Sequence, residues 1–253
     1  LLVRRSDLAE LMNVGGDERI YPASMTKIMT ALLAIENFPD LNETITVPED
    51  IFEELTAQDA SVAGFNPYEQ PTVRDLLYGV LLPSGADACE TLARAVGGSE
   101  EGFVAMMNQK AEELGLANTH FENCTGLHND NHYSTCRDIV VLMNECLKSD
   151  TFREIVTTEI YTTEATASHP DGITLYDTML HRFTSYEMST TLENGAVIEG
   201  GKTGFTDEAG QCLVSFAEYG GEEYILVTAE AMTDSGSAVD SIADASTVYG
   251  RLQ

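Results

Sequence analysis

An apolar stripe with helical spacing begins a few residues after Pro22. Its members are Ile28, Met29, Leu32, Leu33 and Ile35. This spacing predicts a helix rather than a strand, and Pro22 and Ser24 precede it, where helices begin with a fixed φ and a side-chain cap. Ser24 and Lys27 are three residues apart, so they share one helix face. Taken alone, this pair has a purely structural explanation. Ser24 would cap the helix, and Lys27 would lay its aliphatic stem along apolar surface while its charge reaches water.

A helix-rich stretch follows between about residues 70 and 155. Four segments there combine apolar residues at helical spacing with start or stop signals at their ends. They are residues 72–82, 86–98, 99–115 and 134–149. We therefore expect a block of helices, with the sequence Pro83-Ser84-Gly85 interrupting the first two.

Beyond residue 155 the pattern changes to short runs rich in β-branched residues, which predict strands. These runs are residues 155–166, 196–205, 211–219 and 223–232. The last of them alternate poorly between apolar and polar residues, which is typical of strands buried on both faces. Residues 1–13 predict an early strand, and residues 236–250 predict a closing helix. The pattern indicates a helical block inserted between an early strand and helix and a later antiparallel sheet.

Length and charge narrow the possible partners. The chain has 253 residues, enough for one large domain or two subdomains. Its 13 basic and 42 acidic residues give a net charge of −29. Such a charge repels nucleic acid and anionic membrane surfaces, so we expect neither as a partner. No apolar run reaches the roughly 18 residues of a membrane-spanning helix.

The cysteines do not predict a disulfide framework. There are five of them, an odd number, and no two form a Cys-x-x-Cys pair. Cys89, Cys146 and Cys212 fall within apolar patterns and are expected to be small core residues.

An evenly spaced set of soft ligands is the first candidate for chemistry. Its members, four residues apart, are His120, Cys124, His128, His132 and Cys136. On one continuous helix they would form a ladder suited to zinc. Gly126 and the polar run 128–132 interrupt any such helix, so the spacing does not place them on one face. We expect a loop here, and no metal.

The sequence "AVIEGGKT", residues 196–203, is similar to a phosphate-binding loop. Such a loop must follow a strand and open a helix, so that backbone amides point at the phosphate. Here a turn and another predicted strand follow in place of a helix. The segment therefore lacks the helix N-terminus that a nucleotide phosphate needs, and we exclude nucleotide binding.

Three further motifs form a set. Ser24 to Lys27 opens a helix, Ser84 to Ala86 separates two helices, and Lys202 to Gly204 ends a strand. Their order, spacing and contexts match the S-x-x-K, S-x-N and K-T-G set of serine acyl-transferases. The blocks "FENCTGLHNDNHYST" and "GGKTGFTDEAGQCLV" add to the likeness. Over nearly its whole length the chain resembles the low-molecular-mass penicillin-binding proteins, which are serine D-alanyl-D-alanine carboxypeptidases.

The resemblance implies a fold and a domain organisation. The fold is a mixed α/β (α+β), β-lactamase/transpeptidase-like arrangement, with an antiparallel sheet flanked by helices and an all-helical subdomain. Residues 1–253 would form a single catalytic domain, with the helical subdomain at about 45–155 and the site between the two parts. Family members usually carry a further β-rich domain and a membrane anchor, which we expect outside this chain.

The chemistry of an acyl-transfer site explains the first and second motifs. Ser24 at a helix N-terminus is the expected nucleophile, and a serine hydroxyl needs an adjacent base. Lys27 can act as that base if burial and the second ammonium of Lys202 lower its pKa. The resemblance implies that Ser84 relays the proton to the leaving amine.

The third motif is expected to bind the substrate. By resemblance, Lys202 and Thr203 hold the terminal carboxylate, and Gly204 lets the strand approach the substrate backbone closely. The backbone amides of Ser24 and Phe205 are expected to form the oxyanion hole.

Two positions depart from the family pattern. The middle motif ends in Ala86 where the family usually has asparagine, so a substrate-binding amide is missing. The segment "MTDSGSAVDSIAD", residues 232–244, contains no arginine to grip the carboxylate. Neither departure affects the nucleophile or the base, so we still expect an active enzyme.

The expected reaction is removal of the terminal D-alanine from peptidoglycan stem peptides through an acyl-serine intermediate. Stem peptides would be the partners, β-lactams the covalent inhibitors, and no cofactor is implied. The location would be extracytoplasmic, with membrane attachment only through an anchor outside this chain. A β-lactamase of the same fold and a non-catalytic muropeptide-binding protein are the alternatives.

Overall fold

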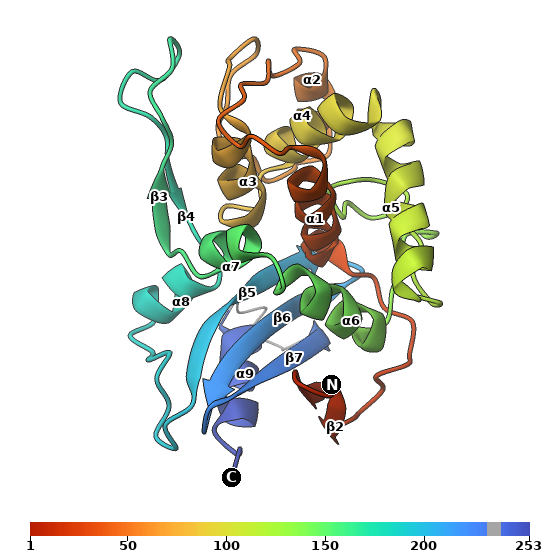
Figure 1. Ribbon diagram of the computed structural model, residues 1–253, viewed down its shortest axis with the longest axis vertical. Coiled ribbons are helices and arrows are strands. Elements are labelled where there is room, and N and C mark those ends of the chain that lie inside the picture. The colour runs from red at the N-terminus through yellow and green to blue at the C-terminus, as the bar shows by residue number, and fades with distance from the viewer. Residues whose placement is uncertain (232–238) are drawn as a thin grey trace.

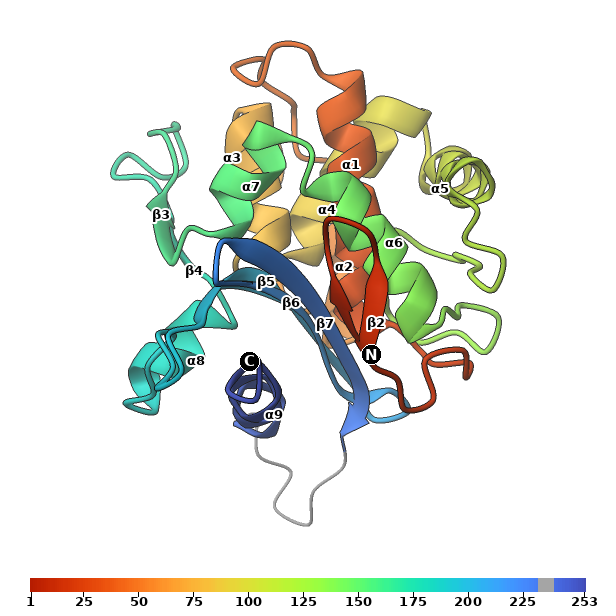
Figure 2. The same cartoon turned by 60° about the horizontal axis from the view of Figure 1, so that its bottom comes forward.

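A five-stranded antiparallel sheet forms the centre of the molecule, in a computed structural model that describes residues 1–231 and 239–253. Its strands, in spatial order, are β2 (Ala9–Met12), β1 (Leu2–Arg4), β7 (Glu222–Ala231), β6 (Gly210–Tyr219) and β5 (Val197–Thr206). Helices cover both faces (Figure 2). The predicted fold class, an antiparallel sheet flanked by helices, is confirmed.

The inner strands contribute side chains to two separate cores. Along β6, Val214 and Phe216 pack into the larger core beneath the helical block, whereas Leu213 and Ala217 pack into the smaller core under α9 (Asp240–Tyr249). Every residue of β6 from 210 to 217 is buried. This two-sided burial explains the weak polar alternation in the sequence.

The helical block lies above the sheet in Figure 1, and α1 (Lys27–Asn37) runs from it down to the edge formed by β5. The block comprises α2 (Ile51–Ala57), α3 (Val73–Leu81), α4 (Ala86–Gly97) and α5 (Glu100–Leu114). Further along the chain, α6 (Cys136–Cys146) and α7 (Asp150–Val156) pack between the block and the sheet. In the part of the chain that the structure describes, no helix is long and apolar enough to cross a bilayer.

Local signals set the helix boundaries in the block. Thr72 and Asp75 form a capping box at the start of α3, with each side chain accepting the other's backbone N–H. Ser99 caps α5 by accepting the Gly102 N–H at 3.1 Å. Gly98 ends α4 with a φ of 76°, a left-handed conformation that suits glycine.

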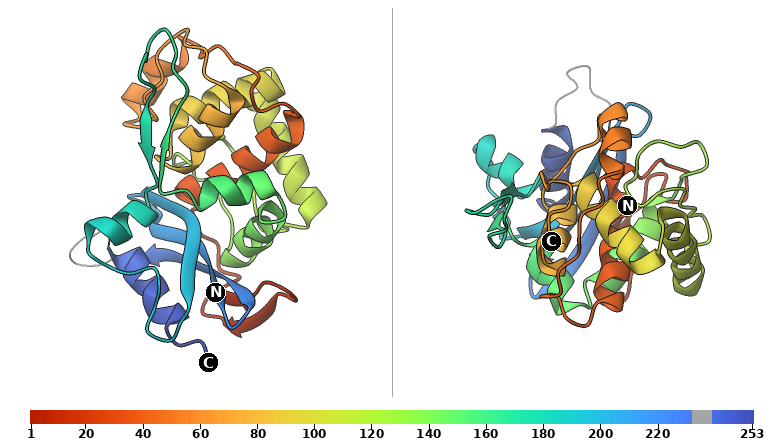
Figure 3. Two further views of the ribbon diagram at one scale, coloured as in Figure 1. Left: turned by 60° about the vertical axis from the view of Figure 1, so that its left-hand side comes forward. Right: turned by 90° about the horizontal axis from the view of Figure 1, so that it is seen from above.

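Some predicted elements differ from the observed ones. Residues 1–13 form a two-stranded hairpin rather than one strand. The predicted strand 155–166 begins inside α7 and contains only β3 (Ile160–Thr162), which pairs with β4 (Thr174–Tyr176) in a separate sheet. This small hairpin rises beside the helical block (Figure 3), and α8 (Leu180–Ser185) follows it. The beginning of the predicted helix 236–250, the end of strand 223–232 and part of segment 232–244 lie outside the described residues.

All five cysteines are buried and free of disulfide bonds. Cys89, Cys146 and Cys212 lie in the core as expected.

Candidate active site

The candidate nucleophile lies on a strained turn. Ser24 belongs to a short 3-10 helix, Ala23–Thr26, that leads directly into α1. Ala23 has a φ of 46°, and a left-handed conformation in a residue other than glycine costs about 1–3 kcal/mol. Ser24 does not cap the helix, because no side-chain capping bond occurs at either helix start. Its hydroxyl oxygen instead accepts a hydrogen bond from Lys27 Nζ at 3.0 Å.

Lys27 is a buried amine held by neutral acceptors. Its side chain donates to Ser24 Oγ and to the carbonyl oxygen of Thr125, the latter at 2.6 Å. No carboxylate forms an ion pair with it within the described residues. Burial lowers the pKa of Lys27, although the nearby Cys89, Cys124 and Asp87 oppose this shift. The environment therefore favours the neutral amine that can take a proton from Ser24.

The loop that carries Thr125 is closed tightly onto the nucleophile's turn. Asn123 Oδ1 accepts the backbone N–H of both Thr125 and Gly126, at 3.2 and 2.7 Å. Gly126 has a φ of 84°, and a Cβ there would lie 1.9 Å from the carbonyl oxygen of Ala23. Only glycine fits this approach, which places the Thr125 carbonyl against Lys27.

The evenly spaced histidines and cysteines do not gather into one group. His120 pairs with Glu122 at 3.0 Å, whereas His128 lies near Asp130 and Glu208. His132 is buried, accepts the Glu122 N–H at Nδ1 and therefore donates from Nε2 to Thr26 Oγ1 at 2.8 Å. Burial lowers the pKa of His132 to about 3. His132 thus acts as a neutral connector between this loop and the nucleophile's turn.

Ser84 occupies the turn between α3 and α4 with a φ of 66°. It is buried, and its hydroxyl has no hydrogen-bond partner among the residues described by the structure. A buried hydroxyl without a partner is uncommon in native proteins. A strained backbone and an unused hydroxyl together are typical of a functional position.

Lys202 and Thr203 lie in the middle of β5 and are both buried. Lys202 Nζ donates to the carbonyl oxygen of Thr203 at 3.1 Å, and Thr203 Oγ1 shares a hydrogen bond of 2.6 Å with Thr178 Oγ1. Burial and the ammonium of Lys27 lower the pKa of Lys202, whereas the attraction of buried Asp177 opposes this shift. The fold therefore disfavours a positive charge on both lysines at the same time.

A pocket of about 80 Å³ opens at Ser24. Among the predicted site residues it is lined by Ser24, Lys27, Ala86 and Phe205. It is not lined by Ser84, Lys202, Thr203 and Gly204. The structure therefore brings the first four residues to one opening and leaves the other four outside its lining.

Gly204 permits a close approach, but in the structure this approach is to the protein itself. A Cβ at 204 would lie 3.0 Å from the carbonyl oxygen of Pro22 and 3.1 Å from the backbone nitrogen of Ser24. The glycine therefore lets β5 pack against the nucleophile's turn, and this packing brings Phe205 to the pocket.

Sequence reasoning missed several groups around the pocket. Thr125 acts through its backbone, so no side-chain pattern reveals it. Ser61 lines the pocket, and its carbonyl oxygen accepts the N–H of Ala86 at 2.7 Å, although its segment carries no motif. The carboxylate of Asp87 accepts backbone N–H groups from residues 63, 64 and 65, and so fixes this segment at the pocket. The sequence offers one signal for this contact, which is the acidic residue Asp87 in the first turn of α4.

Fold and site together define a class of protein. The sheet with its helical block, and a buried lysine one turn after a helix-borne serine, are the features of the penicillin-binding, DD-peptidase class. The Peptidase S11 family model, described as D-alanyl-D-alanine carboxypeptidase, matches residues 10–233. The chain belongs to this family, which confirms the resemblance seen in the sequence.

Curated relatives are similar over most of this chain. D-alanyl-D-alanine carboxypeptidase DacF of Bacillus subtilis is 34% identical over 92% of this chain and 57% of its own length. A D-alanyl-D-alanine carboxypeptidase of Streptomyces sp. (strain K15) is 36% identical over 85% of this chain and 74% of its own. D-alanyl-D-alanine carboxypeptidase DacC of Escherichia coli is 33% identical over 86% of this chain and 52% of its own length. The chain thus spans about half to three quarters of these relatives.

Solved structures share the fold. A mutant of the Streptomyces K15 DD-transpeptidase superposes with a TM-score of 0.84 at 31% identity, covering 98% of this chain and 95% of the other. The D-alanyl-D-alanine carboxypeptidase of Mycobacterium tuberculosis H37Rv superposes with a TM-score of 0.77 at 27% identity, covering 98% of this chain and 87% of the other.

Proposed function

We propose that residues 1–253 form the catalytic domain of a serine D-alanyl-D-alanine carboxypeptidase, with residues of about 45–155 as its helical subdomain. The observation that carries the proposal is the 3.0 Å hydrogen bond from buried Lys27 Nζ to Ser24 Oγ. A base in contact with a nucleophile is the arrangement that activates a serine. Family membership supports the same reaction class.

In the acylation step, neutral Lys27 takes the proton of Ser24 as Oγ forms a bond to the carbonyl carbon before the terminal D-alanine. The C–N bond of that peptide then breaks, and Ser84 relays the proton to the departing amine. Water next adds to the acyl-Ser24 ester and returns free Ser24 with a shortened peptide. The positive end of the short helix and the Ser24 and Phe205 amides stabilise the oxyanion.

Lys202 and Thr203 are proposed to bind the substrate's terminal carboxylate. Lys202 lies in a desolvated position, where a positive charge interacts strongly with a bound anion. Thr203 can exchange its hydrogen bond with Thr178 for one to the substrate. Ala86 lines the pocket with a methyl group in place of the family's amide, so this contact is absent.

The proposed substrates are peptidoglycan stem peptides ending in D-Ala-D-Ala, and β-lactams are proposed to acylate the same serine. Because these substrates lie outside the cytoplasm, we propose an extracytoplasmic location. The net charge of −29 supports neither nucleic acid nor anionic lipid as a partner.

Intact mass after incubation with benzylpenicillin tests the proposal. We expect one covalent equivalent on the parent protein and none on Ser24→Ala, together with D-alanine release from a D-Ala-D-Ala-terminated peptide. Rapid turnover of a chromogenic cephalosporin without an accumulating adduct would instead identify a β-lactamase. Peptide binding with neither adduct nor D-alanine release would identify a non-catalytic binder.

A further inference from the structure

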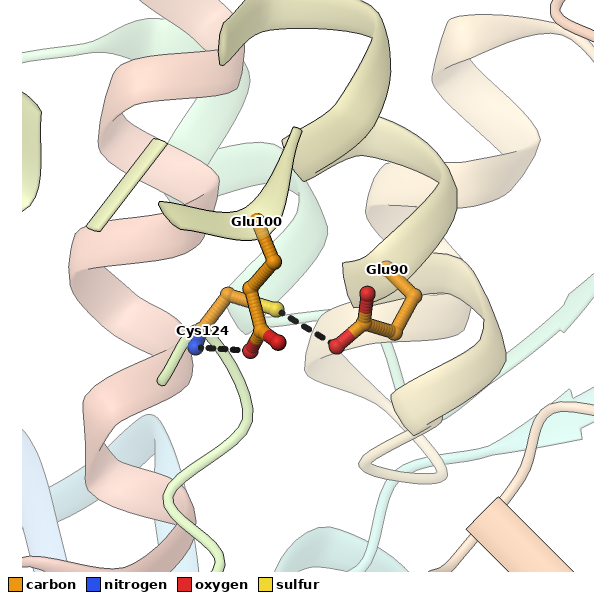
Figure 4. A group of neighbouring side chains, drawn as sticks. All are labelled: Glu90, Glu100 and Cys124. Atoms are coloured by element: carbon orange, nitrogen blue, oxygen red, sulfur yellow. Dashed lines mark hydrogen bonds between the residues drawn. The ribbon is translucent and has the colours of Figure 1, made fainter. Parts of the chain in front are cut away.

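Two carboxylates and a thiol from different elements meet in the group drawn in Figure 4. Glu90 lies on α4, Glu100 is the first residue of α5, and Cys124 lies in the loop that holds Lys27. One potential ligand atom from each residue lies within 4.8 Å of the others. Cys124 Sγ donates to Glu90 Oε1 at 3.5 Å, and the Cys124 N–H donates to Glu100 Oε1 at 3.2 Å.

One carboxylate oxygen of this group is buried without a hydrogen bond. Glu90 is 7% exposed, and its Oε2 has no hydrogen-bond partner among the described residues. The nearest cationic atom is Arg94 Nε at 3.5 Å, and the Nη1 atom of Arg94 is already bonded to Asp50 at 2.6 Å. This long ion pair compensates the buried oxygen only in part, and a proton, water or ion would complete its interactions.

A pocket of about 220 Å³ gives access to the group, and both Glu90 and Glu100 line it. This volume holds several water molecules, because one water occupies about 30 Å³ in the liquid. An ion bound by the three side chains can therefore complete its coordination with water. The thiol of Cys124 is fully buried and does not line the pocket.

The donor set favours a particular class of ion. Two carboxylate oxygens alone would suit calcium or magnesium, because these ions bind oxygen ligands rather than sulfur. Adding a thiolate shifts the preference to zinc and similar divalent ions, which accept mixed sulfur and oxygen ligands. Burial and the charge of Glu100 raise the pKa of Glu90 to about 7, so a proton is the competing occupant.

We propose that Glu90, Glu100 and Cys124 form a binding site for a divalent ion of the zinc class. On binding, the Cys124 S–H bond breaks, sulfur and one oxygen of each glutamate bind the metal, and the released protons pass to water. The sequence argument against a metal concerned the set from His120 to Cys136, from which only Cys124 contributes here. The evidence for this site does not rest on the proposed peptidase activity.

The position of the site connects it to the catalytic base. The Cys124 carbonyl oxygen accepts a hydrogen bond from Thr30 on α1 at 2.6 Å. The next residue, Thr125, holds Lys27 Nζ through its own carbonyl. A metal on Cys124 would thus fix the loop segment that positions Lys27.

Titration with Co²⁺ or Cd²⁺, after chelator treatment, tests the proposal because a bound thiolate produces an ultraviolet charge-transfer band. Surface carboxylates of this acidic chain bind metal without that band. We expect one equivalent with the band on the parent and on Cys146→Ser, another buried cysteine, and no band on Cys124→Ser. Glu90→Gln should weaken binding more than about tenfold, since even supporting residues of metal sites contribute that much.

Absence of the band from the parent protein would overturn the proposal and leave a proton as the occupant. Retention of the band in Cys124→Ser would also overturn it. If Cys124→Ser fails to fold, as judged by circular dichroism, Glu90→Gln and Glu100→Gln decide the outcome. Unchanged affinity in both would then contradict the site, and weakened affinity in both would support it.

Discussion

The carbonyl oxygen of Thr125 lies 2.6 Å from Lys27 Nζ, closer than the 3.0 Å that separates this nitrogen from Ser24 Oγ. The residues are 98 positions apart in sequence. A backbone carbonyl stabilises an ammonium through a dipole but adds no full charge, so it orients Lys27 while burial keeps the pKa low. Base strength and base position therefore depend on different parts of the fold.

The first prediction concerns the pH dependence of acylation. Only neutral Lys27 can take the Ser24 proton, so the acylation rate should fall as the pH drops through the pKa of Lys27. Because burial lowers this pKa, the fall should occur below the value of about 10.4 for a free lysine. The measurement is the rate of benzylpenicillin adduct formation against pH.

Lys27→Arg extends this test. A guanidinium stays protonated in proteins, so acylation should slow by at least about 10²-fold. Lys110→Arg is the matched control, since Lys110 pairs with Glu36 on the surface and should tolerate the change. An acylation rate for Lys27→Arg within a few-fold of the parent would refute the base assignment.

The second prediction separates backbone strain from steric contact at Gly126. Gly115→Ala places a side chain at a φ of 74° in open space and should cost about 1–2 kcal/mol of unfolding free energy. Gly126→Ala adds a clash with the Ala23 carbonyl, so its cost should exceed that of Gly115→Ala by about 1–3 kcal/mol. Urea unfolding measures both, and equal costs would show that the loop relaxes freely.

Gly126→Ala should also slow acylation, because it pushes the Thr125 carbonyl away from Lys27. A shift of about 1 Å can cost up to about 10²-fold in rate. Gly115→Ala should leave the rate unchanged. Equal acylation rates in both variants would show that the position of this loop does not control the base.

The third prediction concerns acid stability. His132 has a pKa of about 3 in the folded protein, against about 6.5 when unfolded. Below about pH 6.5 the unfolded chain therefore binds a proton that the folded chain does not, and stability falls as the pH drops towards 3. Between about pH 7 and pH 5 this loss amounts to about 2 kcal/mol.

His132→Asn isolates this contribution from the many carboxylates. The variant is expected to be less stable at neutral pH, but to lose about 2 kcal/mol less than the parent between about pH 7 and pH 5. His181→Asn, at an exposed position on α8, should follow the parent. The same loss in all three proteins would mean that His132 titrates normally.

Much of the fold could be predicted because local signals agree with the tertiary structure. The Thr72 cap, the Ser99 cap and the Gly98 stop each fix a helix end by bonds within a few residues. The strand predicted over 155–166 begins too early, because Ile155 and Val156, despite their strand propensity, pack as the last turn of α7. Tertiary contacts override propensity at such short segments.

The site could be predicted only in part. Ser24 and Lys27 follow from a spacing of three residues, and Lys202 follows from a motif. The carbonyl of Thr125 could not be found this way, because every residue has one and only the folded loop directs it at Lys27. The group of Glu90, Glu100 and Cys124 joins three elements and likewise has no signature in sequence spacing.

The last prediction concerns Ala86, where the chain departs from its family. Its methyl group lines the 80 Å³ pocket, and its backbone N–H is already bonded to Ser61 at 2.7 Å. The pocket has room for an amide, because its volume exceeds the roughly 30 Å³ that one water occupies. We therefore expect Ala86→Asn to fit without moving α4 and to direct its amide towards Lys27 and a bound substrate.

Each new hydrogen bond contributes about 0.5–1.5 kcal/mol, and about 1.4 kcal/mol is a factor of ten in rate. With one or two such bonds, Ala86→Asn should accelerate acylation by benzylpenicillin by about one to two orders of magnitude. Ala60→Asn is the matched control, since Ala60 lines the same pocket outside the motif. An equal acceleration at position 60 would show a general effect of pocket polarity. Slower acylation by Ala86→Asn would show that the pocket around Ser24 is already filled, so that an added amide displaces Lys27 from the position in which it activates the nucleophile.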